Sequence, residues 1–152
     1  MMIVVDGEGM IFGRLSTFVA KKLLQGEEVS LINAEKILIS GMKDYTIERY
    51  NTKRRLKNKA RPERSSSYPR HPHLLVKRMI RGMLPWKKPS GKTAFRRLRV
   101  YAGKPEAIKE TPAELKYSSP KNITKYMKVK DLCKMLGYEG WLWQRLKKNQ
   151  KK

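Results

Sequence analysis

The chain has 152 residues and is 39% hydrophobic, which suffices for one globular domain over residues 1–152 and leaves little room for a second. Its 36 Lys and Arg outnumber 13 Asp and Glu, and the net charge of +23 calls for an anionic partner such as a phosphate backbone. No apolar run approaches the roughly 18 residues that a membrane span requires, and Cys133, the single cysteine, cannot form an internal disulfide.

The N-terminal third has the pattern of an α/β unit. Residues 3–5 are β-branched and predict a strand. This apolar run ends at Asp6 and is therefore too short for the core of a signal peptide, so we expect a cytoplasmic protein. Apolar residues at helical spacing predict a helix over 12–23, and a second strand follows over 29–32. Strand, helix and strand with short connections predict a parallel crossover.

The middle of the chain is predicted to contain a basic arm. Residues 44 to about 59 favour a helix that becomes basic in its second half, and residues 61–70 have the Pro and Ser content of a loop. Leu56 is the one large aliphatic residue of the segment 53–70, which therefore has almost nothing to bury in a core. We expect this segment to be extended and mobile without a polyanion.

A helix predicted after the arm has two distinct faces. Its apolar face, which should pack into the core, consists of Leu75, Val76, Met79, Ile80 and Met83. Its charged face, which should remain exposed, consists of Lys77, Arg78 and Arg81.

The remaining predicted elements are shorter. A short helix with Phe95 and Leu98 on its inward face precedes a strand over 100–102. A strand over 126–129 and a helix over 132–137 are predicted near the C-terminus. The basic C-terminal tail of about residues 141–152 is compatible with helix or coil.

Positive charge is concentrated in the middle of the chain. Residues 49–104 hold 19 Lys and Arg but one acid, Glu63, whereas residues 1–48 hold 5 basic and 7 acidic residues. This asymmetry favours a polyanion-binding surface over a merely solvated helix face. The interleaved Tyr50, Tyr68 and Trp86 either stack on unpaired bases or pack locally, and both interpretations stay open.

A glycine-rich stretch over residues 7–13 stands where a dinucleotide-binding loop would lie, between a strand and a helix. Its spacing does not match, because Phe12 occupies the third glycine position and Asn33 the position of a ribose-binding acid. We interpret it as a tight turn with close helix–sheet packing and expect no cofactor.

His71 and His73 offer little for catalysis. They flank Pro72, which favours extended backbone and rings that point apart, and neither has an adjacent carboxylate or nucleophile. No metal-ligand spacing joins them to Cys133, which lies at helical spacing from neighbouring leucines and is predicted to be a core residue.

The segment from Arg70 to Pro105 reads RHPHLLVKRMIRGMLPWKKPSGKTAFRRLRVYAGKP and resembles the signature of the large-subunit ribosomal protein family number thirteen. Two N-terminal stretches are similar to the opening of this family, namely VVDGEGMIFGRLSTFVAKKLL and LINAEKILISG. The basic segment between Tyr50 and Arg70 is similar to the archaeal and eukaryotic branch, and the ending of archaeal members is similar to KYMKVKDLCKMLGY.

The resemblance implies a three-layer α/β/α domain around a small, mostly parallel sheet, without enzymatic activity or a small-molecule substrate. It implies an archaeal source, binding to large-subunit ribosomal RNA, a role in subunit assembly, and neighbouring large-subunit ribosomal proteins as partners. Within the signature, the expected RNA contacts are Arg78, Arg81, Lys87, Lys88, Lys92, Arg96, Arg97 and Arg99. The charged helix face and the composition of the arm add Lys77, Lys53, Arg54, Arg55, Lys57, Lys59, Arg61, Arg64 and Arg70.

Two other classes of function stay open. A nucleotide-dependent or nucleic-acid-processing enzyme would need acid–base groups that converge on the loop over 7–13, and beyond Asp6 and Glu8 the N-terminal third supplies no obvious set. A membrane-surface role for the helix over 75–83 would need its apolar face to be free of the core.

Overall fold

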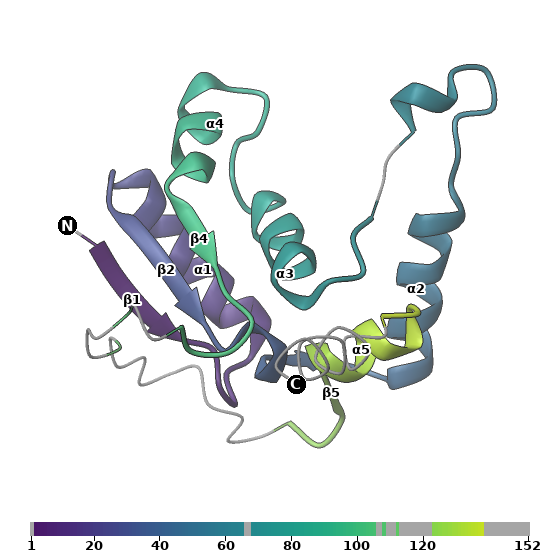
Figure 1. Cartoon of the computed structure of the whole chain (residues 1–152), viewed down its shortest axis with the longest axis horizontal. Helices are drawn as coiled ribbons and strands as arrows, with labels where there is room; N and C mark the ends of the chain where they lie inside the picture. The colour runs from purple at the N-terminus through teal and green to yellow at the C-terminus, as the bar shows by residue number, and fades with distance from the viewer. Residues whose placement is uncertain (1, 66–67, 106–107, 109–111, 113–122, 139–152) are drawn as a thin grey trace, which may run out of the picture.

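The computed structural model, which describes residues 2–65, 68–105, 108, 112 and 123–138, consists of helices and short strands (Figure 1). The helices and strands in chain order are β1 (Met2–Asp6), α1 (Phe12–Leu24), β2 (Glu28–Ile32), β3 (Leu38–Ser40), α2 (Lys43–Arg55), α3 (Pro72–Arg81), α4 (Pro89–Arg96), β4 (Leu98–Val100), β5 (Tyr126–Lys128) and α5 (Val129–Met135). Two 3-10 turns, η1 (Ala34–Lys36) and η2 (Pro62–Arg64), follow β2 and α2.

A three-stranded parallel sheet in the order β1–β2–β4 forms the centre of the fold. Val4 of β1 lies opposite Ser30 of β2, and Leu31 of β2 lies opposite Val100 of β4. The parallel crossover predicted for the N-terminal third is therefore confirmed, with α1 connecting two neighbouring strands. β3 and β5 form a separate antiparallel pair.

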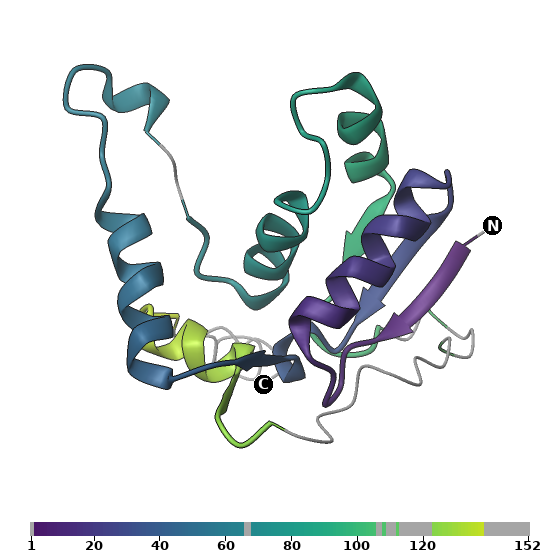
Figure 2. The ribbon, with the colours of Figure 1, turned by 180° about the vertical axis from the view of Figure 1, so that it is seen from behind.

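The two faces of the parallel sheet are covered differently. Strand residues such as Val5 and Leu98 are fully buried in the main core, to which α1, α3 and α4 contribute, and Figure 2 shows α1 lying across this face. On the opposite face, Val4 and Ile32 form a small cluster with Ile108. The α/β class with a small, mostly parallel sheet is confirmed, while no helix in the described ranges covers the second face, so the third layer stays a prediction.

One predicted helix boundary was wrong in the middle of the chain. The helix expected over residues 44 to about 59 is α2, which ends at Arg55, so residues 53–55 of the predicted extended arm are helical. Beyond this point the residues are mostly basic and Leu56 is 64% exposed. Further turns would bring like charges together without burying apolar surface, so the helix has no reason to continue.

The start of β4 was also predicted wrongly. Leu98 is fully buried, as expected, but it begins a strand instead of ending a helix, and the strand expected over 100–102 ends at Val100. Leu98 lies opposite Val29 of β2, whose N–H donates to the carbonyl of Arg97. Pairing with β4 thus satisfies backbone groups at the edge of β2. These groups would lack this partner if the chain continued as a helix past Arg97.

The strand and the helix predicted near the C-terminus are confirmed, but their boundary is shifted. Val129, expected in the strand, is the first residue of α5, which ends at Met135. Gly137 follows with a φ of +82°, the left-handed conformation that ends helices. The basic tail of residues 141–152 lies outside the described residues.

The helix α3 lies between two outlying parts of the fold. α4 extends on one side of it, and α2 with the following arm extends on the other, in both views (Figures 1 and 2). This placement brings the basic middle of the chain to one side of the molecule.

Candidate nucleic-acid interface

The two faces of α3 are those that the sequence predicted. Pro72 occupies the first turn, where its missing N–H costs no hydrogen bond. Leu75, Val76 and Ile80 have no exposed surface and pack in the main core, so this apolar face is not available to a membrane. The cations of the opposite face, Lys77, Arg78 and Arg81, are half-buried.

Two methionines expected on the buried face of α3 behave differently. Met79 is half-buried, and its sulfur accepts a hydrogen bond of 2.6 Å from the Tyr50 hydroxyl. Met83 is 47% exposed, which corrects its assignment to the core. The reason is that α3 ends at Arg81, so Met83 lies in the following turn and leaves the helical stripe.

A cluster of cations and rings joins α3 to α4. The Arg81 guanidinium carbon lies 4.7 Å from the centroid of the Trp86 ring, and the Lys77 ammonium lies 5.3 Å from that of Phe95. The two rings meet edge to face, with centroids 5.2 Å apart. Such cation–π contacts hold the charged groups in place while leaving their N–H donors able to bind anions.

A second cluster joins α3 to the arm. The Arg78 guanidinium carbon lies 5.4 Å from the Tyr68 ring centroid, and the Lys53 ammonium lies 5.2 Å from the Tyr50 centroid and 5.4 Å from that of Tyr68. The two clusters together are called here the cation–aromatic belt, which consists of Lys53, Tyr50, Tyr68, Arg78, Arg81, Lys77, Trp86 and Phe95. The sequence pattern predicts an inward position for Phe95 and gives no sign that its ring holds Lys77.

The positive charges of the belt lie close enough to repel one another. Partial burial and then the nearby Arg78 lower the pKa of the Arg81 guanidinium, which nevertheless remains charged at any physiological pH. Two ion pairs of the described residues, Lys22 with Glu27 and Lys36 with Glu8, lie in the N-terminal third. The belt lies in the segment where Glu63 is the one acid, so its positive potential can attract a polyanion.

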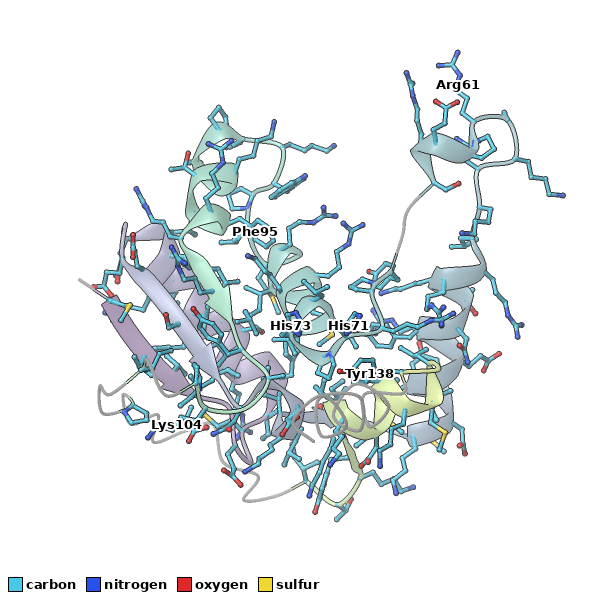
Figure 3. The ribbon with its side chains drawn as sticks, viewed as in Figure 1. Arg61, His71, His73, Phe95, Lys104 and Tyr138 are labelled. Carbon is cyan, nitrogen blue, oxygen red and sulfur yellow. The ribbon has the colours of Figure 1, made fainter. Side chains whose placement is uncertain are left out.

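The arm projects from the end of α2, with Arg61 at its outer tip (Figure 3). The Asn58 amide donates a hydrogen bond of 2.9 Å to the Ser65 hydroxyl. The Arg61 amide donates one of 3.1 Å to the side-chain oxygen of Asn58, and together the two bonds close the tip into a turn. Four expected RNA contacts are exposed there, namely Lys57, Lys59, Arg61 and Arg64.

Arg54 anchors the base of the arm. Its guanidinium donates a hydrogen bond of 2.7 Å to the carbonyl of Leu136, just past the end of α5. This long-range contact could not be read from the sequence, where Arg54 counted only as one of the RNA-binding cations. Its remaining N–H donors are compatible with that role.

Limited trypsin digestion should cleave the free protein first after Lys57, Lys59 or Arg64, because these residues are exposed and few contacts hold their backbone. Arg78 and Arg81 in α3 provide an internal control, since their helix is packed in the core. Equal cleavage rates in the arm and in α3 would contradict this arrangement.

The remaining predicted RNA contacts do not form one surface. Lys87, Lys88, Lys92 and Arg96 are exposed in or just before α4, next to the belt. Arg97 lies partly buried near Gly26, and Arg99 points to the opposite face of the sheet from its buried neighbour Leu98. Arg70 is exposed near Gly137.

The glycine-rich loop has the geometry of a structural turn. The Gly7 amide donates to the carbonyl of Ile32 at 3.0 Å, and a Cβ at Gly7 would lie 2.7 Å from the Ile37 side chain. The Asp6 carboxylate accepts hydrogen bonds of 2.9 Å from the Glu8 amide and from the Asn33 side chain. The carboxylate thus ties the loop to the end of β2.

The two histidines lie closer together than predicted. Their ring centroids are 5.9 Å apart (Figure 3), because Pro72 begins α3 and places His73 in its first turn while His71 caps it. Burial, followed by the nearby His71 and Lys77, lowers the pKa of His73 and so favours its neutral form. His71 packs against Tyr138 with centroids 4.8 Å apart, which indicates a packing role.

Neither a metal site nor a reactive thiol is found in the described part of the chain. No group of three or more His, Cys, Asp or Glu is arranged to hold a metal ion there. Cys133 is fully buried in the main core, which confirms that it is a core residue, and this burial raises the pKa of its thiol to about 12. Among the described helices, none has the length and apolarity to cross a membrane.

Comparison with known proteins decides the family. The profile of the family described as Ribosomal protein L13 matches residues 1–107, which include the belt and the arm. The chain belongs to this family. The protein named large ribosomal subunit protein uL13 from Methanocaldococcus jannaschii is 45% identical over 137 residues, which cover 90% of this chain and 98% of that protein. Its namesake from Aeropyrum pernix is 41% identical over 145 residues, 91% of each chain.

Membership of this family confirms the resemblance noted in the sequence, including its archaeal type, since these relatives come from archaea. The family is one of ribosomal proteins, which also confirms the expectation that the chain is not an enzyme.

Proposed function

We propose that this protein is a component of the large ribosomal subunit that binds large-subunit ribosomal RNA through the cation–aromatic belt and the arm. The observation that supports this most directly is the convergence of cations from α2 and α3 on aromatic rings in a segment with a single acid. Phosphate groups are the partner that satisfies such an array.

We propose further that the protein supports subunit assembly. The belt belongs to the folded domain, whereas the arm tip projects away from it, so one chain can contact RNA at two separate places. Simultaneous contacts at two places hold RNA segments together more strongly than either contact alone. Exposed Met42 and Tyr45 at the start of α2 suit contact with a neighbouring ribosomal protein.

The test is co-sedimentation of tagged protein with large subunits in lysate of its source organism. Lys77→Gln, Arg78→Gln and Arg81→Gln together should move the protein into the free fraction, because they remove the centre of the belt. The matched control replaces Lys21, Lys43 and Lys130, which are exposed on other elements, with Gln. Equal retention of both triple variants would contradict the proposed surface.

A further inference from the structure

The Trp86 ring is held in a defined position next to an exposed turn. A Cβ at Gly91 would collide with the carbonyl of Pro85, so the glycine lets the start of α4 pack directly on the residue before Trp86. The Trp86 amide donates to the Leu84 carbonyl at 2.7 Å, and the Lys88 amide donates to the Pro85 carbonyl at 2.9 Å. These contacts fix the backbone of the turn that carries the ring.

Trp86 is nevertheless 38% exposed, although burying the indole would be favourable. The ring is in contact with the Arg81 guanidinium and meets the Phe95 ring edge to face. Met83, in the preceding turn, is 47% exposed. Planar and apolar surface is therefore exposed in the middle of a strongly basic region, where phosphate binding alone would require only charge.

We propose that Arg81 and Trp86 form a stacking site for an unpaired base of RNA, an inference that rests on the proposed RNA-binding function. A guanidinium or indole plane stacks on a base that is not inside a helix, whereas a continuous duplex presents only backbone and groove edges. Exposed Lys87 and Lys88 follow Trp86 directly and can neutralise the phosphates that flank the base. Trp86 therefore gives the surface a preference for loops and bulges over continuous duplex.

The experiment uses the full chain with Trp141 and Trp143 replaced by Phe, which leaves Trp86 as the single tryptophan. The probes are an RNA hairpin with an adenine loop and the same hairpin with abasic loop nucleotides, so the two carry the same phosphates. We expect the base-bearing loop to quench Trp86 fluorescence and to bind roughly tenfold to a hundredfold more tightly than the abasic loop. Equal affinity with unchanged fluorescence would overturn the stacking site.

Two variants separate stacking from charge. Arg81→Lys keeps the positive charge but loses the plane, so it should lower affinity for the base-bearing loop and leave the abasic loop unaffected. Lys87→Gln should weaken both hairpins equally. The melting temperature of each variant controls for folding. Failure of both hairpins to bind in any salt would contradict the proposed function itself, whereas equal binding would contradict only the stacking site.

Discussion

The affinity of this protein for ribosomal RNA should fall by about 10³–10⁵-fold between ~50 and ~200 mM salt, if roughly 6–10 phosphates are neutralised. Each neutralised phosphate releases condensed counterions, and added salt makes this release less favourable. The net charge of +23 and the exposed cations of the arm and α4 supply more than enough contacts. A titration of binding against salt concentration, plotted on logarithmic axes, measures the number of contacts as its slope.

The same titration locates the contacts. Replacing Lys77, Arg78 and Arg81 by Gln should make the slope shallower by about 2–3, because each neutralised phosphate contributes about 0.7–0.9. The control replacements at Lys21, Lys43 and Lys130 should leave the slope nearly unchanged, since these residues lie outside the belt and the arm. A slope near zero for the unmodified protein would rule out binding dominated by phosphates.

Ile80→Ala should destabilise the fold by about 2–5 kcal/mol, because the Ile80 side chain is fully buried in the main core and its removal leaves a cavity. This loss is a large share of the roughly 5–15 kcal/mol that stabilises a typical domain. Urea denaturation, followed by circular dichroism, measures the change in the free energy of unfolding.

The opposite face of the same helix should respond in the opposite way. Arg78→Ala with Arg81→Ala should weaken RNA binding while costing little stability, because a cation–π interaction at a partly exposed site contributes only about 0.5–1 kcal/mol. Comparable destabilisation by the Ile80 and arginine variants would show that the two faces of α3 are assigned wrongly.

The amino-acid pattern by itself determined the elements that depend on neighbours in sequence. Residues three and four apart share a helix face, so the apolar and charged sides of α3 could be predicted, and short β-branched, apolar runs predicted β1 and β2. The absence of acids from the basic region predicted a polyanion-binding surface, since charge needs no geometry to be counted. The mismatched glycine spacing of residues 7–13 likewise predicted a structural turn.

The tertiary structure decided the features that depend on residues distant in sequence. The bond from Arg54 to the Leu136 carbonyl and the pairing of Leu98 with Val29 join segments whose separation carries no periodic signal. The helical start at Pro72 brought the two histidines together where local backbone preference predicted separation. The belt arises in the same way, because its rings can hold the cations of α3 only after packing of the core has placed α4 on one side of α3 and α2 with the arm on the other.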